Sequence, residues 1–161
     1  MSDATKANLD SLAAFPDRLK RQVQGLGDAA LRFRPGPAEW SVVEVVGHLA
    51  DVEALYTARI RQMLATDHPT FPPFDPDATV RQRDYQNKQI GFLLITFAER
   101  RAEHLELLRV LRPAQLARTG LHPTRGAISV ADSIAILAWH DGNHSGQIAA
   151  NLAAFVRAGE R

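Results

Sequence analysis

Apolar residues recur at steps of three and four along most of the chain, which is the spacing of one face of an α-helix. The clearest case is Val45, Leu49, Val52, Tyr56, Ile60 and Met63. No segment alternates convincingly with period two, so the pattern gives no signal for a strand. Because an amphipathic helix must bury its apolar stripe against another element, we predict an all-α fold of helices packed on helices.

Four helical segments can be separated along the chain. The first carries an apolar stripe over residues 9–26, and Pro16 is expected to kink or restart it. The second begins with a capping box of Ser41 and Glu44 and keeps helical spacing to residue 63. After it, the loop "DHPTFPPFDPD" contains four prolines and is expected to form neither helix nor sheet.

The third segment is predicted over residues 80–111, with Thr79 and Gln82 as a second capping box. The fourth runs over residues 129–159 and begins with a serine cap. A length of 161 residues suits one domain, so we predict a single four-helix bundle over residues 1–161. In such bundles a metal or cofactor is usually held by facing side chains near the middle of the helices.

Charge and composition limit the partners. The 19 basic and 18 acidic residues are scattered, and no basic run could neutralise a row of phosphates, so nucleic acid is not expected as a partner. No apolar run approaches the length of about 20 residues that spans a bilayer, and no start resembles a signal peptide. We therefore expect a cytoplasmic protein with no membrane partner. The chain has no cysteine, so histidine, aspartate or glutamate must hold any metal.

Three histidines are candidates for such a site. In "WHDGNHSGQI", His140 and His144 lie one turn apart on the apolar face of the fourth segment, and His48 lies on the apolar face of the second. Three imidazoles leave an open coordination position on zinc, nickel, copper or iron, as catalytic sites do. The alternative is a set of core histidines, each satisfied by a hydrogen bond. The desolvation cost of burying three imidazoles favours the metal site.

Further candidates follow from helical spacing around these histidines. Asp51 and Gln147 each lie about one turn from a predicted ligand, where they could orient an imidazole or contact a catalytic water. Tyr56 and Arg59 follow on the second segment and could line a pocket for a cofactor. His104 is a reserve ligand on the third segment.

The remaining histidines and glycines have simpler interpretations. His68 and His122 lie in proline-bearing connectors and are expected to be solvated, and Glu53 is expected to point away from the predicted ligands. Gly142 and Gly146 share a helix face opposite the histidines, at a cost of about 1 kcal/mol each relative to alanine. Their spacing suggests a close contact on that face, within the bundle or across a dimer, and the equal alternative is a loss of helix stability that the fold tolerates.

The segment "WSVVEVVGHLADVE", followed about ninety residues later by "HDGNHSGQI", resembles the DinB and YfiT superfamily of four-helix-bundle metalloproteins. The resemblance spans most of the chain. It implies that His48, His140 and His144 bind one divalent metal, with zinc or nickel expected, and that the helices are connected up, down, down, up. It also implies a homodimer.

The same resemblance implies chemistry on a small-molecule substrate. Characterised members of the superfamily include transferases and isomerases that use bacillithiol or mycothiol, and other members are known as damage-inducible proteins or candidate metal-dependent hydrolases. We expect a metal-dependent thiol S-transferase or hydrolase; the thiol would be an external small molecule, since the chain has no cysteine. The alternatives are a non-catalytic, stress-related protein that binds a metal or ligand, and a helical interaction module without metal.

Overall fold

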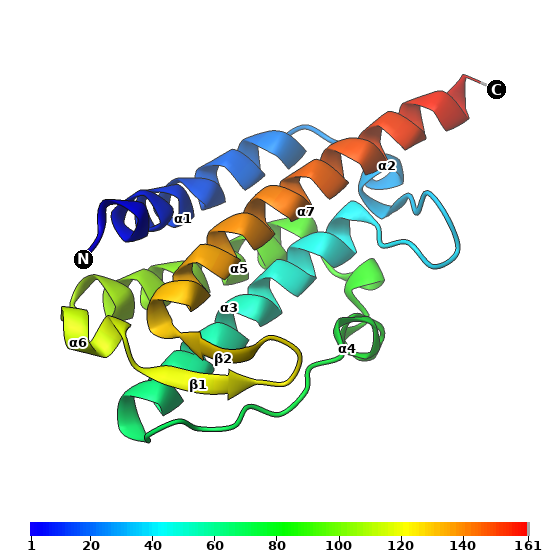
Figure 1. The fold of residues 1–161 in the computed structure, drawn as a ribbon. Helices are drawn as coiled ribbons and strands as arrows, with labels where there is room; N and C mark the ends of the chain where they lie inside the picture. Colours follow the sequence, from blue (N-terminus) through cyan, green and yellow to red (C-terminus); the bar gives the residue numbers. More distant parts are fainter. Residues whose placement is uncertain (161) are drawn as a thin grey trace.

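Four long helices pack side by side in the computed structural model, which describes residues 1–160 (Figure 1). They are α1 (Asp3–Val23), α3 (Val42–Ala65), α5 (Ile90–Arg109) and α7 (Val130–Gly159). Helices α1 and α3 each contact both α5 and α7, so the four surround one core. Helices α1 and α7 run in one direction and α3 and α5 in the other (Figure 1). The predicted four-helix bundle, connected up, down, down, up, is confirmed.

The helices that carry the histidines begin where the sequence predicts. The Ser41 hydroxyl accepts a hydrogen bond from the Glu44 amide, and the Glu44 carboxylate accepts one from the Ser41 amide at 2.9 Å. Arg34 also binds this carboxylate. At the start of α7, Ser129 and Asp132 form the same reciprocal cap. Both caps satisfy amides that the first turn of a helix leaves free, which fixes where each helix starts.

The prediction of one continuous helix over residues 80–111 is wrong. The structure divides it into α4 (Pro76–Arg83), a short 3-10 turn η1 (Tyr85–Asn87) and α5. The break is at Asp84, whose φ of 52° is left-handed and cannot continue a helix. Residues 81–89 contain no proline or glycine to signal the break, which is why the sequence suggests one long helix.

The capping box expected at Thr79 and Gln82 is also wrong. Helix α4 begins four residues earlier, and its N-cap is Asp75, whose carboxylate accepts a hydrogen bond from the Ala78 amide at 2.9 Å. Pro76 is tolerated because the first residue of a helix has no need of its amide hydrogen. The end of the proline-rich loop is therefore helical.

Short elements complete the chain. A two-stranded antiparallel hairpin, β1 (Thr119–His122) and β2 (Gly126–Ser129), lies beside the lower end of α3 (Figure 1). Each strand has four residues, too few to show as a period-two pattern, so the expectation of no strand is wrong here. The other short elements are the helices α2 (Asp28–Arg32) and α6 (Pro113–Leu116). Helix α1 continues through Pro16 instead of restarting there.

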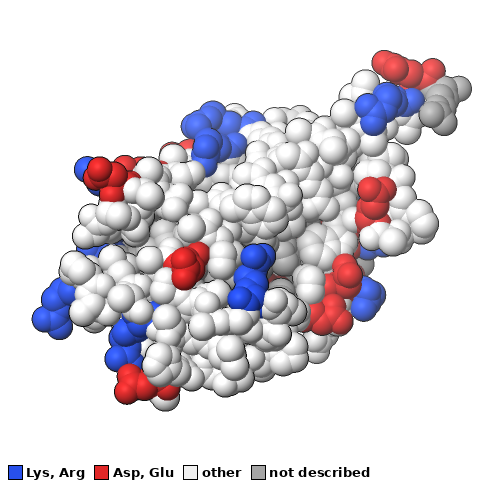
Figure 2. Space-filling view, viewed as in Figure 1, with Lys and Arg blue, Asp and Glu red and all other residues white. Residues whose placement is uncertain are grey.

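Charged side chains lie both on the surface and in the core. On the face in Figure 2, acidic and basic side chains are interspersed with no continuous field of one sign. No helix within residues 1–160 is long and apolar enough to cross a membrane. The largest fully buried side chain of the core is a charged one, Arg101.

Candidate metal centre

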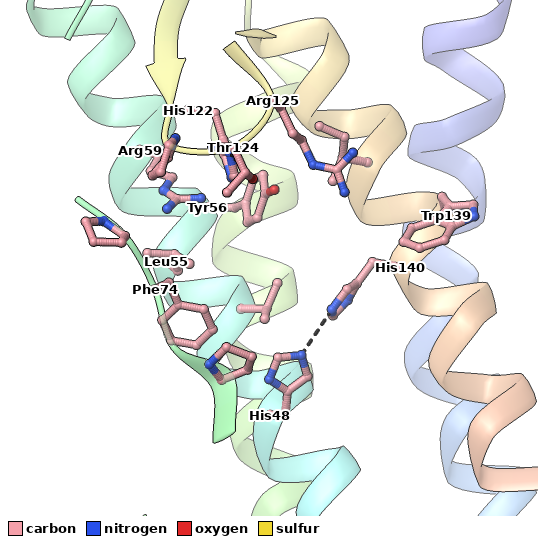
Figure 3. Close-up of a pocket in the computed structure, with 15 residues that line it drawn as sticks. His48, Leu55, Tyr56, Arg59, Phe74, His122, Thr124, Arg125, Trp139 and His140 are labelled. Carbon is pink, nitrogen blue, oxygen red and sulfur yellow. Dashed lines mark hydrogen bonds between the residues drawn. The ribbon is translucent and has the colours of Figure 1, made fainter. Parts of the chain in front are cut away.

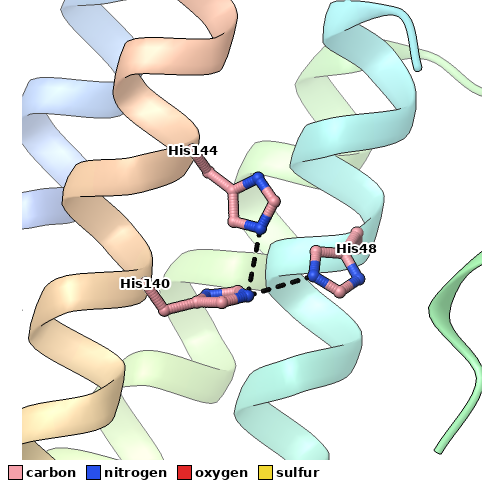
Figure 4. Close-up of side chains that lie close together, drawn as sticks. All are labelled: His48, His140 and His144. Atoms are coloured by element: carbon pink, nitrogen blue, oxygen red, sulfur yellow. Dashed lines mark hydrogen bonds between the residues drawn. The ribbon is translucent and has the colours of Figure 1, made fainter. Parts of the chain in front are cut away.

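The three predicted ligands converge between α3 and α7. His48 extends from α3, and His140 and His144 extend from successive turns of α7 (Figure 4). The Nε2 atom of His140 lies 3.1 Å from Nε2 of His48 and 3.0 Å from Nε2 of His144. One nitrogen from each ring lies within 4.8 Å of the others. We call these residues the histidine cluster.

These distances suit three ligands of one cation. Two imidazole nitrogens that bind zinc at about 2.0–2.1 Å lie roughly 3.0–3.4 Å apart when the angle between them is near tetrahedral or somewhat smaller. The separations of 3.1 and 3.0 Å are at the lower end of this range. The donor set, three nitrogens with no thiolate, is one that zinc, nickel, copper and iron accept.

Hydrogen bonds between the three rings cannot satisfy all of their facing nitrogens. The Nδ1 atom of His144 donates to Oε1 of Gln147 at 2.8 Å, which leaves the lone pair of a neutral ring on Nε2. His140 Nε2 faces both this nitrogen and Nε2 of His48, and it has only one position for a proton or a lone pair with which to meet the two. A cation that accepts all three lone pairs removes this conflict.

The environment keeps the three rings neutral. Burial, together with the proximity of His144, lowers the pKa of His48 to about 3. Burial also lowers the pKa of His140 to about 2, with further contributions from the other two histidines. The pKa of His144 is lowered by burial as well. Since only a neutral imidazole offers a lone pair, the cluster is ready to bind a metal at neutral pH.

Aromatic rings enclose the cluster. The Trp40 ring centroid lies 4.8 Å from that of His48 and 6.3 Å from that of His144, with the second pair stacked. On another side, Phe74 stacks on His48 at 6.3 Å. These rings hold the imidazoles in place and exclude water from part of the site.

A cavity of about 310 Å³ opens onto the cluster (Figure 3). Its walls come from α3, α7, the end of the proline-rich loop and the turn of the hairpin. The lining residues are His48, Val52, Leu55, Tyr56, Arg59, Pro73, Phe74, Pro76, His122, Pro123, Thr124, Arg125, Ile136, Trp139 and His140. The predicted pocket residues Tyr56 and Arg59 are among them, at the end away from His48 (Figure 3).

Asp51 takes a different partner from the one its spacing suggests. Its carboxylate accepts a hydrogen bond from the Tyr85 hydroxyl at 2.6 Å and lies 3.4 Å from the Arg100 guanidinium. Tyr85 comes so close to α3 that a Cβ on Gly47 would lie 2.4 Å from its ring. Asp51 is not among the residues that line the cavity. Gln147, by contrast, contacts a predicted ligand directly.

The reserve ligand His104 belongs to a separate group. Its Nδ1 atom donates to Glu53 at 3.0 Å, and Arg101 donates to Glu53 at 2.7 Å and to Asp141 at 2.8 and 3.0 Å. We call these four residues the charged cluster. Burial acts to raise the pKa of Glu53, but the hydrogen bond from His104 and the charge of Arg101 outweigh it and hold the pKa at about 2. For Asp141 burial prevails over Arg101 and raises the pKa to about 6.

Sequence reasoning missed the charged cluster and part of the pocket. Arg101 follows Phe97 by one turn and so falls on a buried helix face, a signal that could have identified it. His122, expected to be solvated, is half-buried in the wall of the cavity, whereas His68 is exposed as expected. Arg125 enters the cavity wall through the hairpin turn, for which the helical pattern gives no signal.

The close contact expected at two glycines is absent within the described chain. A Cβ built on Gly142 or Gly146 meets no atom within 4 Å. Both glycines are exposed on α7. A tight packing of this face inside the bundle is therefore wrong, and a contact across a dimer stays a prediction.

Comparison with known proteins gives consistent family relationships. A family model described as the DinB superfamily matches residues 11–148. A protein of Oceanobacillus iheyensis named "putative metal-dependent hydrolase" is 29% identical over 140 residues, which are 87% of this chain and 81% of that protein. YfiT of Bacillus subtilis, which carries the same description, is 28% identical over 138 residues, 85% of this chain and 78% of its own.

Two solved structures have the same fold. The structure of Bacillus subtilis YfiT, titled "a probable metal-dependent hydrolase with an unusual four-helix bundle topology", superposes with a TM-score of 0.86 at 25% identity. The superposition covers 99% of this chain and 90% of YfiT. A mycothiol-dependent maleylpyruvate isomerase superposes with a TM-score of 0.71 over 88% of this chain and 59% of its own. At 9% identity, this second similarity shows the fold alone.

Proposed function

The chain belongs to the DinB superfamily, and from that premise we propose that it is a metal-dependent enzyme acting on a small molecule at the histidine cluster. The observation that supports this most is the convergence of three imidazoles beside a cavity of about 310 Å³. Nε2 of His140 lies 3.1 Å from Nε2 of His48 and 3.0 Å from Nε2 of His144. Three ligands beside an open cavity are typical of a catalytic rather than a structural site.

The residues of the chain have distinct tasks in this proposal. His48, His140 and His144 hold the cation, and Gln147 orients the ring of His144 through Nδ1. When bound, a divalent cation such as zinc or nickel polarises the substrate and lowers the pKa of a coordinated thiol or water. The apolar cavity wall, with Phe74 at the histidine end, excludes bulk water from the reacting groups.

We favour thiol-dependent group transfer as the reaction. Among the described residues, none with a carboxylate lines the cavity, so the site offers no acidic side chain as a general base for water. A thiol is far more acidic than water, so it forms a thiolate near neutral pH without such a base. Because the chain has no cysteine, the thiol must arrive as a separate small molecule. A mycothiol-dependent isomerase has the same fold, so this fold is compatible with a thiol-dependent reaction.

Hydrolysis is the second candidate. It is supported by the names of the relatives, which describe metal-dependent hydrolases. In this reaction Gln147 would act through the ring of His144, because it accepts from Nδ1 of that ring and does not line the cavity.

The two reactions can be separated by assaying the metal-loaded protein on 1-chloro-2,4-dinitrobenzene and on p-nitrophenyl acetate. Each substrate is tested with bacillithiol, mycothiol, glutathione or no thiol, and His48→Ala is the control. Conjugation with one thiol that disappears in the control supports transfer. Ester cleavage without thiol that disappears in the control supports hydrolysis. No turnover in either assay, with metal bound, would favour a non-catalytic metal-binding protein.

We also propose that the protein is a homodimer, in line with the resemblance. Helix α7 presents an open face with Gly142 and Gly146, and Trp139 and Val156 on the same helix are 62% and 57% exposed. Light scattering should give about twice the chain mass of 17.7 kDa at micromolar concentration. A mass of one chain over that range would contradict the proposal. If α7 forms the interface, Gly146→Leu should weaken the dimer without unfolding the chain.

A further inference from the structure

Arg59 is a buried cation without an anionic partner. The residue is 4% exposed, and its guanidinium donates a hydrogen bond to the carbonyl of Pro72 at 3.2 Å. The guanidinium lies over the rings of Tyr56 and Phe71 at 5.5 and 5.2 Å, and its Nε atom has no partner among the described residues. Within residues 1–160 no carboxylate lies within ion-pair distance of it.

Arg101 shows how the same fold treats a buried arginine that serves structure. That guanidinium, 1% exposed, is held by two carboxylates, Glu53 and Asp141. An uncompensated charge in a protein interior is strongly unfavourable, so the core supplies counter-charges where it can. The isolation of Arg59 indicates that its anion comes from outside the chain.

A second cation borders the same space. Arg125, in the exposed hairpin turn, lines the cavity together with Arg59, and no aspartate or glutamate of the described chain does. Figure 3 shows both arginines at one end of the cavity, with His48 and His140 at the other. The cavity therefore has one positively charged end and one end suited to a metal.

We propose that the arginine end of the cavity binds the carboxylate of an elongated small molecule whose other end reaches the histidine cluster. The proposal rests on the proposed function for the reacting end only. Arginine presents parallel N–H groups that match both oxygens of a carboxylate. Arg59 lies eleven residues after His48, or about 16 Å along the helix axis, and its side chain leans back toward His48. The ligand is thus a carboxylate on a chain of several carbons.

Octanoate and octanamide form a matched pair of probes, because they differ only in the charged group. In calorimetric titrations of the metal-free protein, octanoate should bind at least about tenfold more tightly, as expected for hydrogen bonds to a charged group. The variant Arg59→Gln should remove this preference. Arg61→Gln is the control, since Arg61 lies on the same helix but is exposed and paired with Glu103.

Arg125→Gln protects the test against misfolding, because Arg125 is exposed and its loss cannot unfold the bundle. It should reduce the octanoate preference severalfold. Equal binding of acid and amide by the wild-type protein, no binding of either, or a preference that survives in both Arg59→Gln and Arg125→Gln would overturn the proposal.

A second experiment uses 8-mercaptooctanoate and 8-mercaptooctanamide with the cobalt-loaded protein. Thiolate-to-cobalt absorption reports the reacting end, and the acid-to-amide ratio of affinities reports the arginine end. Tighter binding of 8-mercaptooctanoate than of octanoate would assign the carboxylate to the thiol reactant, and equal binding would assign it to the other substrate. If the protein binds no cobalt but still prefers octanoate, the proposed function fails and the carboxylate site stands.

Discussion

The charged cluster and the histidine cluster lie in the same core, but only the charged cluster pairs groups of opposite charge. In the charged cluster, Arg101 donates to Glu53, to Asp141 and to the carbonyl of Leu12, so that a cation meets anions and an acceptor. In the histidine cluster, three groups of one kind point their Nε2 atoms at one another. Both clusters include residues of α3 and α7, and both are largely buried.

The difference indicates that the charged cluster stabilises the fold and that the histidine cluster binds a cation. A buried polar group is stable when its partner is inside the protein, and the charged cluster supplies such partners. Three lone pairs that converge have no partner of opposite character among residues 1–160, so their arrangement is favourable only with an added cation. The clusters should therefore respond in opposite ways to mutation and to metal.

The largest effect on folding is expected from Arg101→Met. It leaves the carboxylates of Glu53 and Asp141 buried without their cation, so the free energy of unfolding should fall by about 3–5 kcal/mol. Urea titration of the metal-free protein measures this change. The control Arg61→Met breaks an exposed ion pair and should cost no more than about 1 kcal/mol. A loss for Arg101→Met as small as that of the control would mean that the charged cluster does not stabilise the core.

A smaller and different effect is expected from Gln147→Ala. Loss of the hydrogen bond to Nδ1 of His144 frees the ring to turn, so metal affinity should fall about 10–100-fold while folding stability changes little. Competition with a chelator of known affinity measures the change. Gln62→Ala, an exposed glutamine on α3, is the matched control. Unchanged metal affinity in Gln147→Ala would show that the ring needs no such support.

Asp51→Asn should have the smallest effect. The carboxylate belongs to a hydrogen bond with Tyr85, so the expected loss is about 1 kcal/mol of folding stability. Metal affinity should stay the same, because Asp51 does not line the cavity. Competition with the same chelator measures the metal affinity of this variant. A tenfold loss of metal affinity would return Asp51 to the role that its spacing in the sequence suggested.

These residues show which parts of the site a sequence can predict. His140, His144 and Gln147 lie within two turns of one helix, where spacing alone determines which side chains are neighbours. His48 faces them because capped amphipathic helices turn their apolar faces to a common core. The four-helix bundle follows from the same periodicity.

Asp51 and the hairpin show where such reasoning ends. The partner of Asp51 comes from the break between α4 and α5, which brings Tyr85 onto α3, and helical periodicity is blind to that break. His122 reaches the cavity from the end of a strand of only four residues, and Arg125 reaches it from the hairpin turn. These placements depend on tertiary contacts between segments far apart in the chain.

The central claim is that the histidine cluster holds a metal, and metal analysis of protein purified without chelators or metal-affinity resin tests it most directly. We expect about one divalent transition metal per chain, an affinity at least about 100-fold lower in His144→Ala, and full occupancy in His104→Ala, which removes a histidine of the charged cluster. Circular dichroism should show that both variants keep their helices. A wild-type protein that binds no zinc or nickel even when offered an excess, or a His144→Ala variant that retains full occupancy and affinity, would contradict the claim.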